Sequence, residues 1–382
     1  MDRAPDSVSG CSYGNGGLIV PSHFVPLAAP GMAWRGIRMM ANRRSPFGFE
    51  SLLNLEVLSW VGKFMRASSA AHVAQAAPLL RDMNLASRGL YEEIISRLGI
   101  SCGFGKRGLL MLCATKKALN TEAHLATEAG RLGLPAQVLD KTGLRQVDPG
   151  VTMNAAGGVY FEDDAHLTPA AFMVALRHYL SGAGVEFVTR EVRAFRVAAG
   201  RVEAAEEIAG DLFVLAGGAW TSHLCKSLGF RLPLLAGKGY GFTVAEARET
   251  LSVPSILTEA RVAVTPMQDG ARFVGTMELG RPNERLNPHR IAGIRDSIQN
   301  YYPALLASEV PVNAVWNGAR PCSPDGLPYV GTTGSYQNVI VCAGHAMMGM
   351  SLGPISGKLV GELASGDEPS IPLDLLSPNR YA

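Results

Sequence analysis

The sequence predicts an α/β protein in which a domain of mixed or antiparallel sheet and helices is inserted into a second, discontinuous α/β domain. Three observations support this fold class. Helix-like and strand-like segments alternate on both sides of residues 229–317, whereas that stretch carries the alternating runs of an antiparallel sheet. Glycine-rich turns stand at the ends of apolar strands and near the start of the chain. A length of 382 residues suits two or three domains at about 150 residues each.

The composition excludes several classes of protein. Glycine supplies 43 of the 382 residues, above the usual ~7%, which favours many tight turns. Charged residues make up 18% against about 25% in an average chain, and 47% of the residues are hydrophobic. These values exclude a disordered, collagen-like or disulfide-stapled chain. The net charge of +2, without a stretch dense in Lys or Arg, gives no electrostatic reason to expect nucleic acid as a partner.

The six cysteines are not spaced like metal ligands or a disulfide framework. None forms a C-x-x-C pair and their gaps are irregular, so we expect free thiols in a reducing compartment and no metal site. No apolar run reaches the ~18 residues that a membrane span needs. The N-terminal segment also lacks the basic-then-apolar order of a signal peptide. We therefore expect a cytoplasmic protein and leave peripheral contact with the inner face of the membrane open.

The N-terminal part of the chain is predicted as a loop followed by helices. Residues 10–17 form a glycine-rich loop. Residues 18–48 contain four prolines, which indicates a winding surface segment. From residue 52 to residue 98, apolar side chains recur mostly three or four positions apart, as one buried face of a helix pair requires.

The middle of the chain alternates between strands and helices. Thr168 and Pro169 suit the N-cap and the first position of a helix that ends at Gly182 and Gly184. Alternation on both sides favours a parallel partner for the strand at residues 211–216. The other expected elements are strands at Leu109–Cys113, Gly158–Phe161 and Val185–Thr189 and a helix near Thr121–Leu132.

The last third begins with a change to alternating polar and apolar residues. This pattern predicts an antiparallel sheet, followed by a helix and then by a return to α/β order. The expected strands are Tyr240–Val244, Arg261–Thr265, Arg272–Gly275 and Val339–Ala343, and the expected helices lie near Arg290–Leu306 and Ser351–Ala364.

The glycine-rich turns are the first candidates for a binding site. They lie at Ser12–Gly17, Ala216–Trp220 and Ala343–Gly349. Ligands of an open α/β sheet collect at the carboxyl ends of its strands, where glycine lets the backbone approach a ligand closely. A following helix offers its free N–H groups to negative charge. The alternative is that these segments are only tight turns.

Arg320 is the strongest candidate for a substrate contact. It lies between two proline-rich turns, just before the last α/β segment. A guanidinium that is held rigidly there can bind a carboxylate through two parallel hydrogen bonds. An ion pair with Asp325 is the equally open structural alternative.

Two C-terminal motifs carry a family pattern: Gly318-x-Arg320-Pro321 with Pro324-Asp325-Gly326-x-Pro328, and Gly344-His345 with Gly349. The N-terminal stretch Gly10–Gly17, followed by Val20-Pro21-Ser22, carries another. Together they resemble the FAD-dependent amine oxidoreductases, a family that includes glycine oxidase and the D-amino-acid dehydrogenases. The N-terminal stretch is most similar to the D-amino-acid and D-hydroxyproline dehydrogenases.

The resemblance implies a division into two domains. Residues 1–50, 151–228 and 318–382 would form an FAD-binding, Rossmann-like domain, and residues 51–150 and 229–317 a substrate domain. The family begins with a strand, a G-x-G-x-x-G turn, a helix and a second strand that ends at an acidic residue. Asp2 falls at that acidic position, so we expect the first βαβ unit, roughly 30 residues, to be missing. The expectation is a sequence that starts late or a chain that binds flavin poorly.

The same resemblance implies roles for residues at both ends of the chain. Arg320 would hold the substrate carboxylate, Tyr240 would line the substrate pocket and His345 would contact the flavin. The alternatives are a core position for Tyr240 and hydrogen bonds to the backbone for His345. The residues expected to bind FAD are Asp2, Ser12, Asn15, Gly16, Gly17, Val192, Ala216, Gly217, Trp220, Gly344, His345, Met348, Gly349 and Met350.

The activity implied by the resemblance is oxidation of a D-amino acid, with D-proline or hydroxy-D-proline as candidate substrates. A hydride would pass from the substrate Cα to flavin N5, and a quinone or the respiratory chain could accept the electrons. Such chemistry needs orientation and an uncharged amine rather than a strong base. One alternative is a sarcosine- or glycine-type oxidase that uses oxygen. Another is a truncated, non-catalytic flavoprotein-like subunit.

Overall fold

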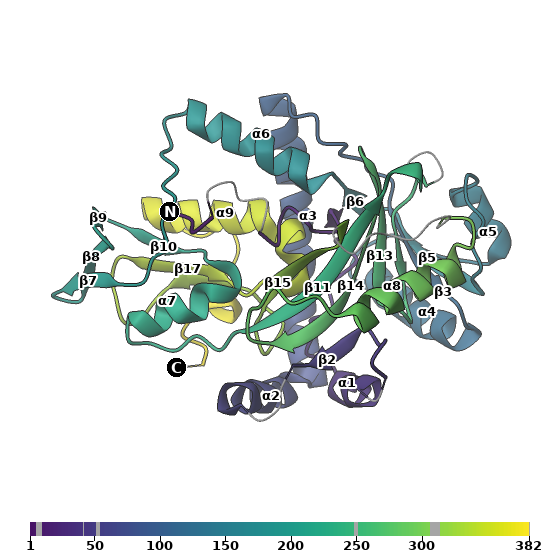
Figure 1. Ribbon diagram of the computed structural model, residues 1–382, viewed down its shortest axis with the longest axis horizontal. Helices are drawn as coiled ribbons and strands as arrows, with labels where there is room; N and C mark the ends of the chain where they lie inside the picture. Colours follow the sequence, from purple (N-terminus) through teal and green to yellow (C-terminus); the bar gives the residue numbers. More distant parts are fainter. Residues whose placement is uncertain (5–9, 41, 51–53, 248–250, 306–313, 382) are drawn as a thin grey trace.

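The computed structural model describes residues 1–4, 10–40, 42–50, 54–247, 251–305 and 314–381. Figure 1 shows a large mixed sheet on the right and a smaller sheet on the left, with helices packed around both. The helices are α1 Met32–Met40, α2 Leu55–Ala67, α3 Ala70–Leu98, α4 Lys116–Arg131, α5 Lys141–Val147, α6 Pro169–Gly182, α7 Thr221–Ser227, α8 Pro288–Tyr301 and α9 Gly349–Ser365. The strands are β1 Leu18–Ile19, β2 Phe47–Phe49, β3 Leu109–Cys113, β4 Ala136–Leu139, β5 Gly157–Phe161, β6 Ala165–His166, β7 Phe195–Ala198, β8 Arg201–Ala205, β9 Ile208–Ala209, β10 Phe213–Leu215, β11 Leu235–Val244, β12 Ser255–Leu257, β13 Val262–Met267, β14 Gly270–Gly280, β15 Trp316–Cys322, β16 Tyr329–Thr332 and β17 Val339–Ala343.

The large sheet has the strand order β15-β11-β14-β13-β12-β3-β5-β4, with β2 beside β14. Strands β11, β13 and β14 pair antiparallel to one another, which confirms the antiparallel sheet predicted within residues 229–317. The outer strand β15 also runs antiparallel to β11, in a register that sets Arg320 opposite Gly237 and Asn317 opposite Tyr240. Strand β3 joins the sheet through parallel pairing with β12.

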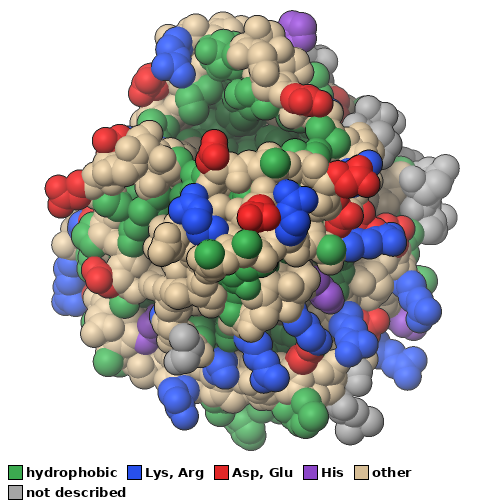
Figure 2. Space-filling model, turned by 90° about the vertical axis from the view of Figure 1, so that its left-hand side faces the viewer, with side chains coloured by type: hydrophobic (Ala, Val, Ile, Leu, Met, Phe, Trp, Pro, Cys, Tyr) green, Lys and Arg blue, Asp and Glu red, His purple; other side chains and the backbone are tan. Residues whose placement is uncertain are grey.

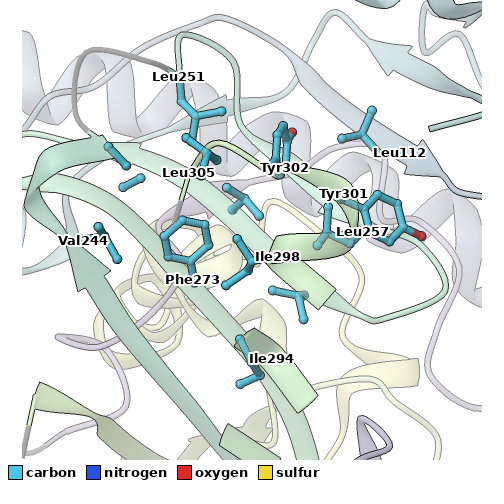
Figure 3. Close-up of a cluster of buried hydrophobic side chains, with 14 of the residues drawn as sticks. Leu112, Val244, Leu251, Leu257, Phe273, Ile294, Ile298, Tyr301, Tyr302 and Leu305 are labelled. Carbon is cyan, nitrogen blue, oxygen red and sulfur yellow. The ribbon is translucent and has the colours of Figure 1, made fainter. Parts of the chain in front are cut away.

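The core of this half lies between the sheet and helix α8. Side chains alternate across a strand, so Tyr240 and Phe242 of β11 point to the same face as Phe273 of β14. Figure 3 shows Phe273 close to Ile298 of α8, in the cluster that this face buries. The glycines that intervene along β11 therefore face the opposite side of the sheet. That glycine-rich face is where the candidate site lies.

The small sheet has the order β10-β17-β16. Strand β10 runs parallel to β17, as the alternation of helices and strands predicts. Helix α9 starts shortly after β17 and packs against the long helix α3, around a core that includes Met83, Leu352 and Ile355. The sequence therefore places the carboxyl end of β17 and the start of α9 next to each other, as a nucleotide-binding turn requires.

Two local expectations are wrong. Residues 18–48 are not only a surface segment: they form α1, and the side chains of Val20, Phe24 and Ala28 are buried. Residues 185–189 make a single parallel bridge, between Thr189 and Asp2, and not a strand, because only Asp2 pairs with them among the described residues. The start of α6 is confirmed, with Thr168 at the N-cap and Pro169 at the first helical position, although the hydroxyl of Thr168 accepts the N–H of Gln268 instead of an N–H of the helix.

The predicted domain boundaries cut across the sheets in places. Strands β2 and β5 belong to the large sheet, although residues 1–50 and 151–228 were expected in the other domain. Strand β15 crosses the expected boundary at residue 318. The two-domain division therefore stays a prediction.

In the described part of the chain, none of the helices combines the length and the hydropathy that crossing a bilayer requires. All six cysteines are free, as the sequence predicts.

Candidate active site

Arg320 is held on the glycine-rich face of the large sheet. Its Nη1 donates a hydrogen bond to the backbone oxygen of Thr276 at 2.6 Å. The guanidinium crosses Gly239 of the neighbouring strand so closely that a Cβ at that position would overlap it. Glycine at 239 therefore lets the guanidinium lie this close to the backbone, and a larger residue there would displace the arginine. Strand β15 and Gly239 together aim the guanidinium along the face of the sheet.

The expected alternative for Arg320, an ion pair with Asp325, does not form. Asp325 is bound by Arg380 near the C-terminus, with Nε 2.6 Å from Oδ2 and Nη2 2.9 Å from Oδ1. Burial alone would raise the pKa of Asp325, but the hydrogen bonds and charge of Arg380 outweigh burial and hold that pKa below its usual range. The ion-pair partner of Asp325 is therefore Arg380 and not Arg320, which the spacing in the sequence had suggested.

The guanidinium of Arg320 therefore lacks a carboxylate partner within the ranges that the structure describes. Burial lowers the pKa of Arg320, which reflects a charge removed from water without a compensating anion. An arginine stays protonated at physiological pH even so. The remaining N–H donors of Arg320 are suited to a carboxylate supplied by a ligand.

Tyr240 does not reach this face. Its ring is fully buried in the core beneath α8, and its hydroxyl donates to Oε2 of Glu278 at 2.7 Å. The period-two alternation of β11 gives the physical reason, because a side chain at 240 points away from the face to which residues 239 and 241 belong. The core alternative for Tyr240 is the one that the structure supports.

A cavity of about 1550 Å³ opens over the glycine-rich face and extends to α9 and β10. Figure 2 shows the molecule hollowed near the top of one face, with hydrophobic side chains lining the hollow. Most of the predicted site residues line this cavity. They are Asp2, Ser12, Asn15, Gly16, Val192, Ala216, Gly217, Trp220, Arg320, His345, Met348, Gly349 and Met350.

Two predicted glycines shape the cavity wall without lining it. Gly17 has a φ of +68°, and its N–H donates to Oδ1 of Asn15 at 2.9 Å, which closes the N-terminal loop on itself. Gly344 has a φ of +81°, and a Cβ there would lie 2.7 Å from Cδ2 of Tyr329. Both positions need glycine for the turn.

At one end of the cavity the first residues of the chain meet two distant segments. The N–H of Asp2 donates to the oxygen of Val188 at 2.9 Å, and the N–H of Arg190 donates to the oxygen of Asp2 at 2.7 Å. The guanidinium of Arg3 lies 3.8 Å from the ring centre of Trp220. These contacts bring Asp2, which the resemblance assigns to the adenosine and ribityl regions, and Trp220, which it assigns to the flavin phosphates, to one cavity.

The N-terminus of α9 forms another part of the wall. Met348, Gly349 and Met350 line the cavity, and the helix has no side-chain cap. Its first N–H groups and the positive end of its dipole therefore favour negative charge. His345, just before this turn, shares a hydrogen bond of 2.8 Å between its Nε2 and Oγ of Ser356. Burial lowers the pKa of His345 to about 4, so the ring is neutral at pH 7.

The residues fit FAD. The cavity exceeds the roughly 300–1,000 Å³ of ordinary ligand pockets, which leaves room for a dinucleotide together with a small substrate. The uncapped start of α9 suits a ring that gains negative charge on reduction. The glycines of the N-terminal loop and of the turn at Gly217 let the backbone come close to a cofactor. Asp2 and Val192 would hold the adenosine end, Trp220 would lie near the phosphates, and Met348–Met350 would face the flavin end.

Sequence reasoning missed several cavity residues. Thr276, whose oxygen fixes Arg320, has a φ of +72° that no sequence signal announced. Arg261, with Glu122 and Arg35, lines the cavity on the side of α4. Arg261 lies just before β13 with a φ of +54°, so strand alternation does not fix the direction of its side chain. The Nε1 of Trp316, another cavity residue, is buried and has no hydrogen-bond partner among the described residues.

The chain is similar in sequence to curated proteins. The D-amino acid dehydrogenase of Helicobacter pylori is 26% identical over 365 residues, covering 94% of this chain and 87% of that protein. The D-amino acid dehydrogenase of Bradyrhizobium diazoefficiens is 27% identical over 393 residues, covering 100% and 92%.

Solved structures support the fold. Glycine oxidase from Geobacillus kaustophilus superposes with a TM-score of 0.73 at 24% identity, covering 80% of this chain and 84% of that one. L-proline dehydrogenase from P. horikoshii gives a TM-score of 0.70 at 18% identity, covering 79% and 83%. The FAD dependent oxidoreductase family matches residues 1–363, nearly the whole chain. This protein therefore belongs to the FAD-dependent oxidoreductases, with FAD as its cofactor.

Proposed function

We propose that the protein oxidises the amine of a D-amino acid, with D-proline and hydroxy-D-proline as the first substrates to test. The single observation that carries the proposal is the guanidinium of Arg320, which lines the cavity and has no carboxylate partner among the described residues. The names of the curated relatives, D-amino acid dehydrogenases, support the substrate class. The N-terminal resemblance to D-hydroxyproline dehydrogenases supports the choice of ring substrates.

The residues of the chain would act by binding and orienting the substrate. Arg320 would hold the carboxylate in its fork, while the bond to Thr276 keeps the guanidinium from turning away. Because Gly239 has no side chain, the guanidinium can lie against the sheet, and the substrate would occupy the space above it. When bound, FAD supplies the two-electron acceptor for the hydrogen at the substrate Cα.

The cavity would also keep the substrate amine uncharged and dry. His345 is neutral, so it adds no positive charge near the amine. The side chains of Met111, Ile256 and Val274 give the sheet side of the cavity an apolar lining that excludes water. Because the lone pair of a free amine assists removal of the Cα hydrogen, activity should rise with pH until the substrate amine is deprotonated.

We further propose that a quinone or another carrier of the respiratory chain accepts the electrons, from a cytoplasmic position in peripheral contact with the membrane. The support is that the curated relatives are named dehydrogenases. The glycine oxidase fold favours the alternative, a sarcosine- or glycine-type oxidase. Peroxide released in proportion to substrate would favour the oxidase, whereas reduction of a quinone analogue without peroxide would favour the dehydrogenase.

The substrate class is tested by turnover of matched enantiomers. The purified protein loaded with FAD is assayed by dye reduction with D- and L-proline, hydroxy-D-proline, D- and L-alanine, sarcosine and glycine. Preferential turnover of the D-enantiomers supports the proposal. Turnover confined to glycine and sarcosine, or to L-enantiomers, contradicts it. The visible spectrum of the same sample records FAD binding, which separates loss of cofactor from a wrong substrate.

A further inference from the structure

A second group of charged side chains lines the cavity that contains Arg320. Arg261 lies just before β13, Glu122 lies on α4 and Arg35 lies on α1, and all three line the cavity. Figure 1 shows α1 and α4 on the same lower side of the large sheet. Binding of a substrate carboxylate by Arg320 does not use these side chains, so they are available to another part of the ligand.

The pairing of β13 with β14 sets Arg261 beside the point that anchors Arg320. Val262 pairs with Gly275, and a Cβ added to Gly275 would lie 3.4 Å from the backbone oxygen of Arg261. Thr276, whose oxygen accepts the hydrogen bond of Arg320, follows Gly275 directly. Paired strands lie about 5 Å apart. The side chain of Arg261 therefore starts about one strand spacing from the place where the guanidinium of Arg320 is held.

The backbone is left-handed at both of these positions. The angle φ is +54° for Arg261 and +72° for Thr276. This conformation is unfavourable for residues other than glycine, and where it persists it is found mostly at ligand-binding and catalytic sites. The two outliers therefore mark this end of β13 and β14 as a part of the sheet that is shaped around a ligand.

Glu122 is a buried carboxyl group without a bonded partner. It is only 6% exposed, and it makes no hydrogen bond or ion pair with the described residues. Burial raises the pKa of Glu122, while the charges of Arg261 and Arg35 oppose that rise. Buried polar groups are nearly always hydrogen-bonded. A buried carboxyl that lines a cavity and lacks such a bond therefore points to a ligand.

The guanidinium of Arg261 is also open to a ligand. The other acidic neighbour of Arg261, Glu259, accepts hydrogen bonds from the N–H groups of Ala114 and Thr115 and from the hydroxyls of Thr115 and Tyr301. These bonds fix Glu259 at the start of α4. The side chain of Arg261 is accessible, and yet burial lowers its pKa, as expected for a charge that faces an internal cavity.

We propose that Arg261 and Glu122 bind a hydroxyl group on the side chain or ring of the substrate, and so select hydroxy-D-proline over D-proline. The inference rests on the proposed function, in which Arg320 holds the substrate carboxylate. A hydroxyl both donates and accepts hydrogen bonds, so it can donate to the carboxyl of Glu122 and accept from the guanidinium of Arg261. A second substrate carboxylate would face the carboxyl of Glu122, and an ammonium group would face the guanidinium groups of Arg261 and Arg35. A hydroxyl satisfies both partners.

Paired kinetics on hydroxy-D-proline and D-proline, which differ by one hydroxyl, test the proposal. The measured quantity is the ratio of kcat/KM for the two substrates with the FAD-loaded protein. We expect the wild type to favour hydroxy-D-proline by about tenfold or more, because D-proline leaves the two buried partners without their hydrogen bonds. Arg261→Met keeps the length of the side chain without its donors, and Glu122→Gln keeps the shape of the carboxyl without its charge. Each variant should lower the ratio by about tenfold.

Matched controls change the same residue types away from the cavity. Arg145→Met on α5 and Glu128→Gln on the exposed side of α4 should both keep the ratio of the wild type. The visible flavin spectrum of every variant verifies that the protein is folded and holds FAD. Since Arg261→Met and Glu122→Gln act on the same contact from two elements, a folding defect in one variant leaves the other to decide.

The outcomes separate this inference from the proposed function. A wild-type ratio near one, or a ratio that Arg261→Met and Glu122→Gln leave unchanged, overturns the hydroxyl contact while oxidation of D-amino acids stands. A preference for D-glutamate or D-lysine that the same variants abolish overturns it too, because the pair would then bind a charged side group.

Absence of turnover with every D-amino acid contradicts the proposed function and still leaves the contact testable. Anaerobic titration of the flavin spectrum with the same two ligands measures their dissociation constants whether or not flavin is reduced. Tighter binding of hydroxy-D-proline that is lost in Arg261→Met and Glu122→Gln supports the hydroxyl contact, and equal dissociation constants overturn it.

Discussion

The guanidinium of Arg320 lies directly against Gly239 of the adjacent strand, in the space that any larger residue would need for its Cβ. The pairing register brings this about, because Gly239 lies opposite Gly318, two residues before Arg320 on the same face of β15. The arginine can therefore lie flat over β11 and reach the backbone oxygen of Thr276 on β14. The position of the guanidinium therefore depends on the lack of a side chain at residue 239 as well as on the hydrogen bond to Thr276.

Gly239→Ala tests this relationship. The added methyl group should push the guanidinium away from Thr276. The expected loss of substrate binding free energy is about 1.5–3 kcal/mol, the usual contribution of a hydrogen bond to a charged group. The KM for a D-amino acid should then rise by about tenfold to a hundredfold, while FAD stays bound. Gly89→Ala, in α3 where a Cβ meets no atom within 4 Å, is the control and should leave KM unchanged. Unaltered KM in Gly239→Ala would show that the guanidinium position does not matter.

Arg380 should matter for stability rather than for substrate binding. Its side chain and that of Asp325 are only 12% and 8% exposed, and Arg380→Ala would leave the carboxylate buried without its partner. We expect a loss of about 3–5 kcal/mol in the free energy of unfolding, measured by urea denaturation. Arg380→Lys keeps the charge without the fork and should lose less. A raised KM at unchanged stability would contradict this assignment.

Asp164 should make stability depend on pH. Burial raises its pKa to about 7, although the N–H and hydroxyl of Ser22 bind the carboxylate. Between pH 4 and 7 the folded state then holds a proton that the unfolded state has released, so the free energy of unfolding falls as pH rises, by at most about 1.4 kcal/mol per pH unit.

Asp164→Asn removes this titration. Thermal melts at pH 5 and pH 7.5 should show the wild type losing stability relative to Asp164→Asn at the higher pH. Asp367→Asn, at an exposed carboxylate after α9, serves as the control and should keep the pH dependence of the wild type. The same pH dependence in wild type and Asp164→Asn would exclude Asp164 as its source.

Much of the fold was predictable because its strands are short apolar runs with clear ends. The strands at Leu109–Cys113 and Val339–Ala343 were predicted with their observed bounds. Helix α1 was missed because four prolines around it signalled a loop, while its packing on Phe47 depends on tertiary contact. Residues 185–189 were over-predicted, because an apolar run does not reveal whether a partner strand lies beside it.

The parts of the site formed by the glycine-rich turns and by Arg320 were predictable from the sequence. The partner of Arg320 was not, since sequence spacing suggested Asp325 and the fold gives that carboxylate to a residue 55 positions away. Thr276 and Arg261 were missed because both adopt a positive φ that no sequence signal marks, and Thr276 also falls where the β11–β14 pairing shifts register. Tyr240 was predicted to line the pocket because the sequence alone does not show which residues of β11 face the site; that follows only from the pairing register.

The steady-state kinetics of Arg320→Ala, with Arg320→Lys beside it, test the central claim that this arginine holds the substrate carboxylate. We predict normal FAD absorbance in both variants and a KM for the D-amino acid raised by about a hundredfold or more in Arg320→Ala, since a charged bidentate contact is lost. Arg320→Lys should recover part of that loss, because it restores the charge but not the fork. An unchanged KM in Arg320→Ala, with FAD bound, would contradict the claim and remove Arg320 from the substrate site.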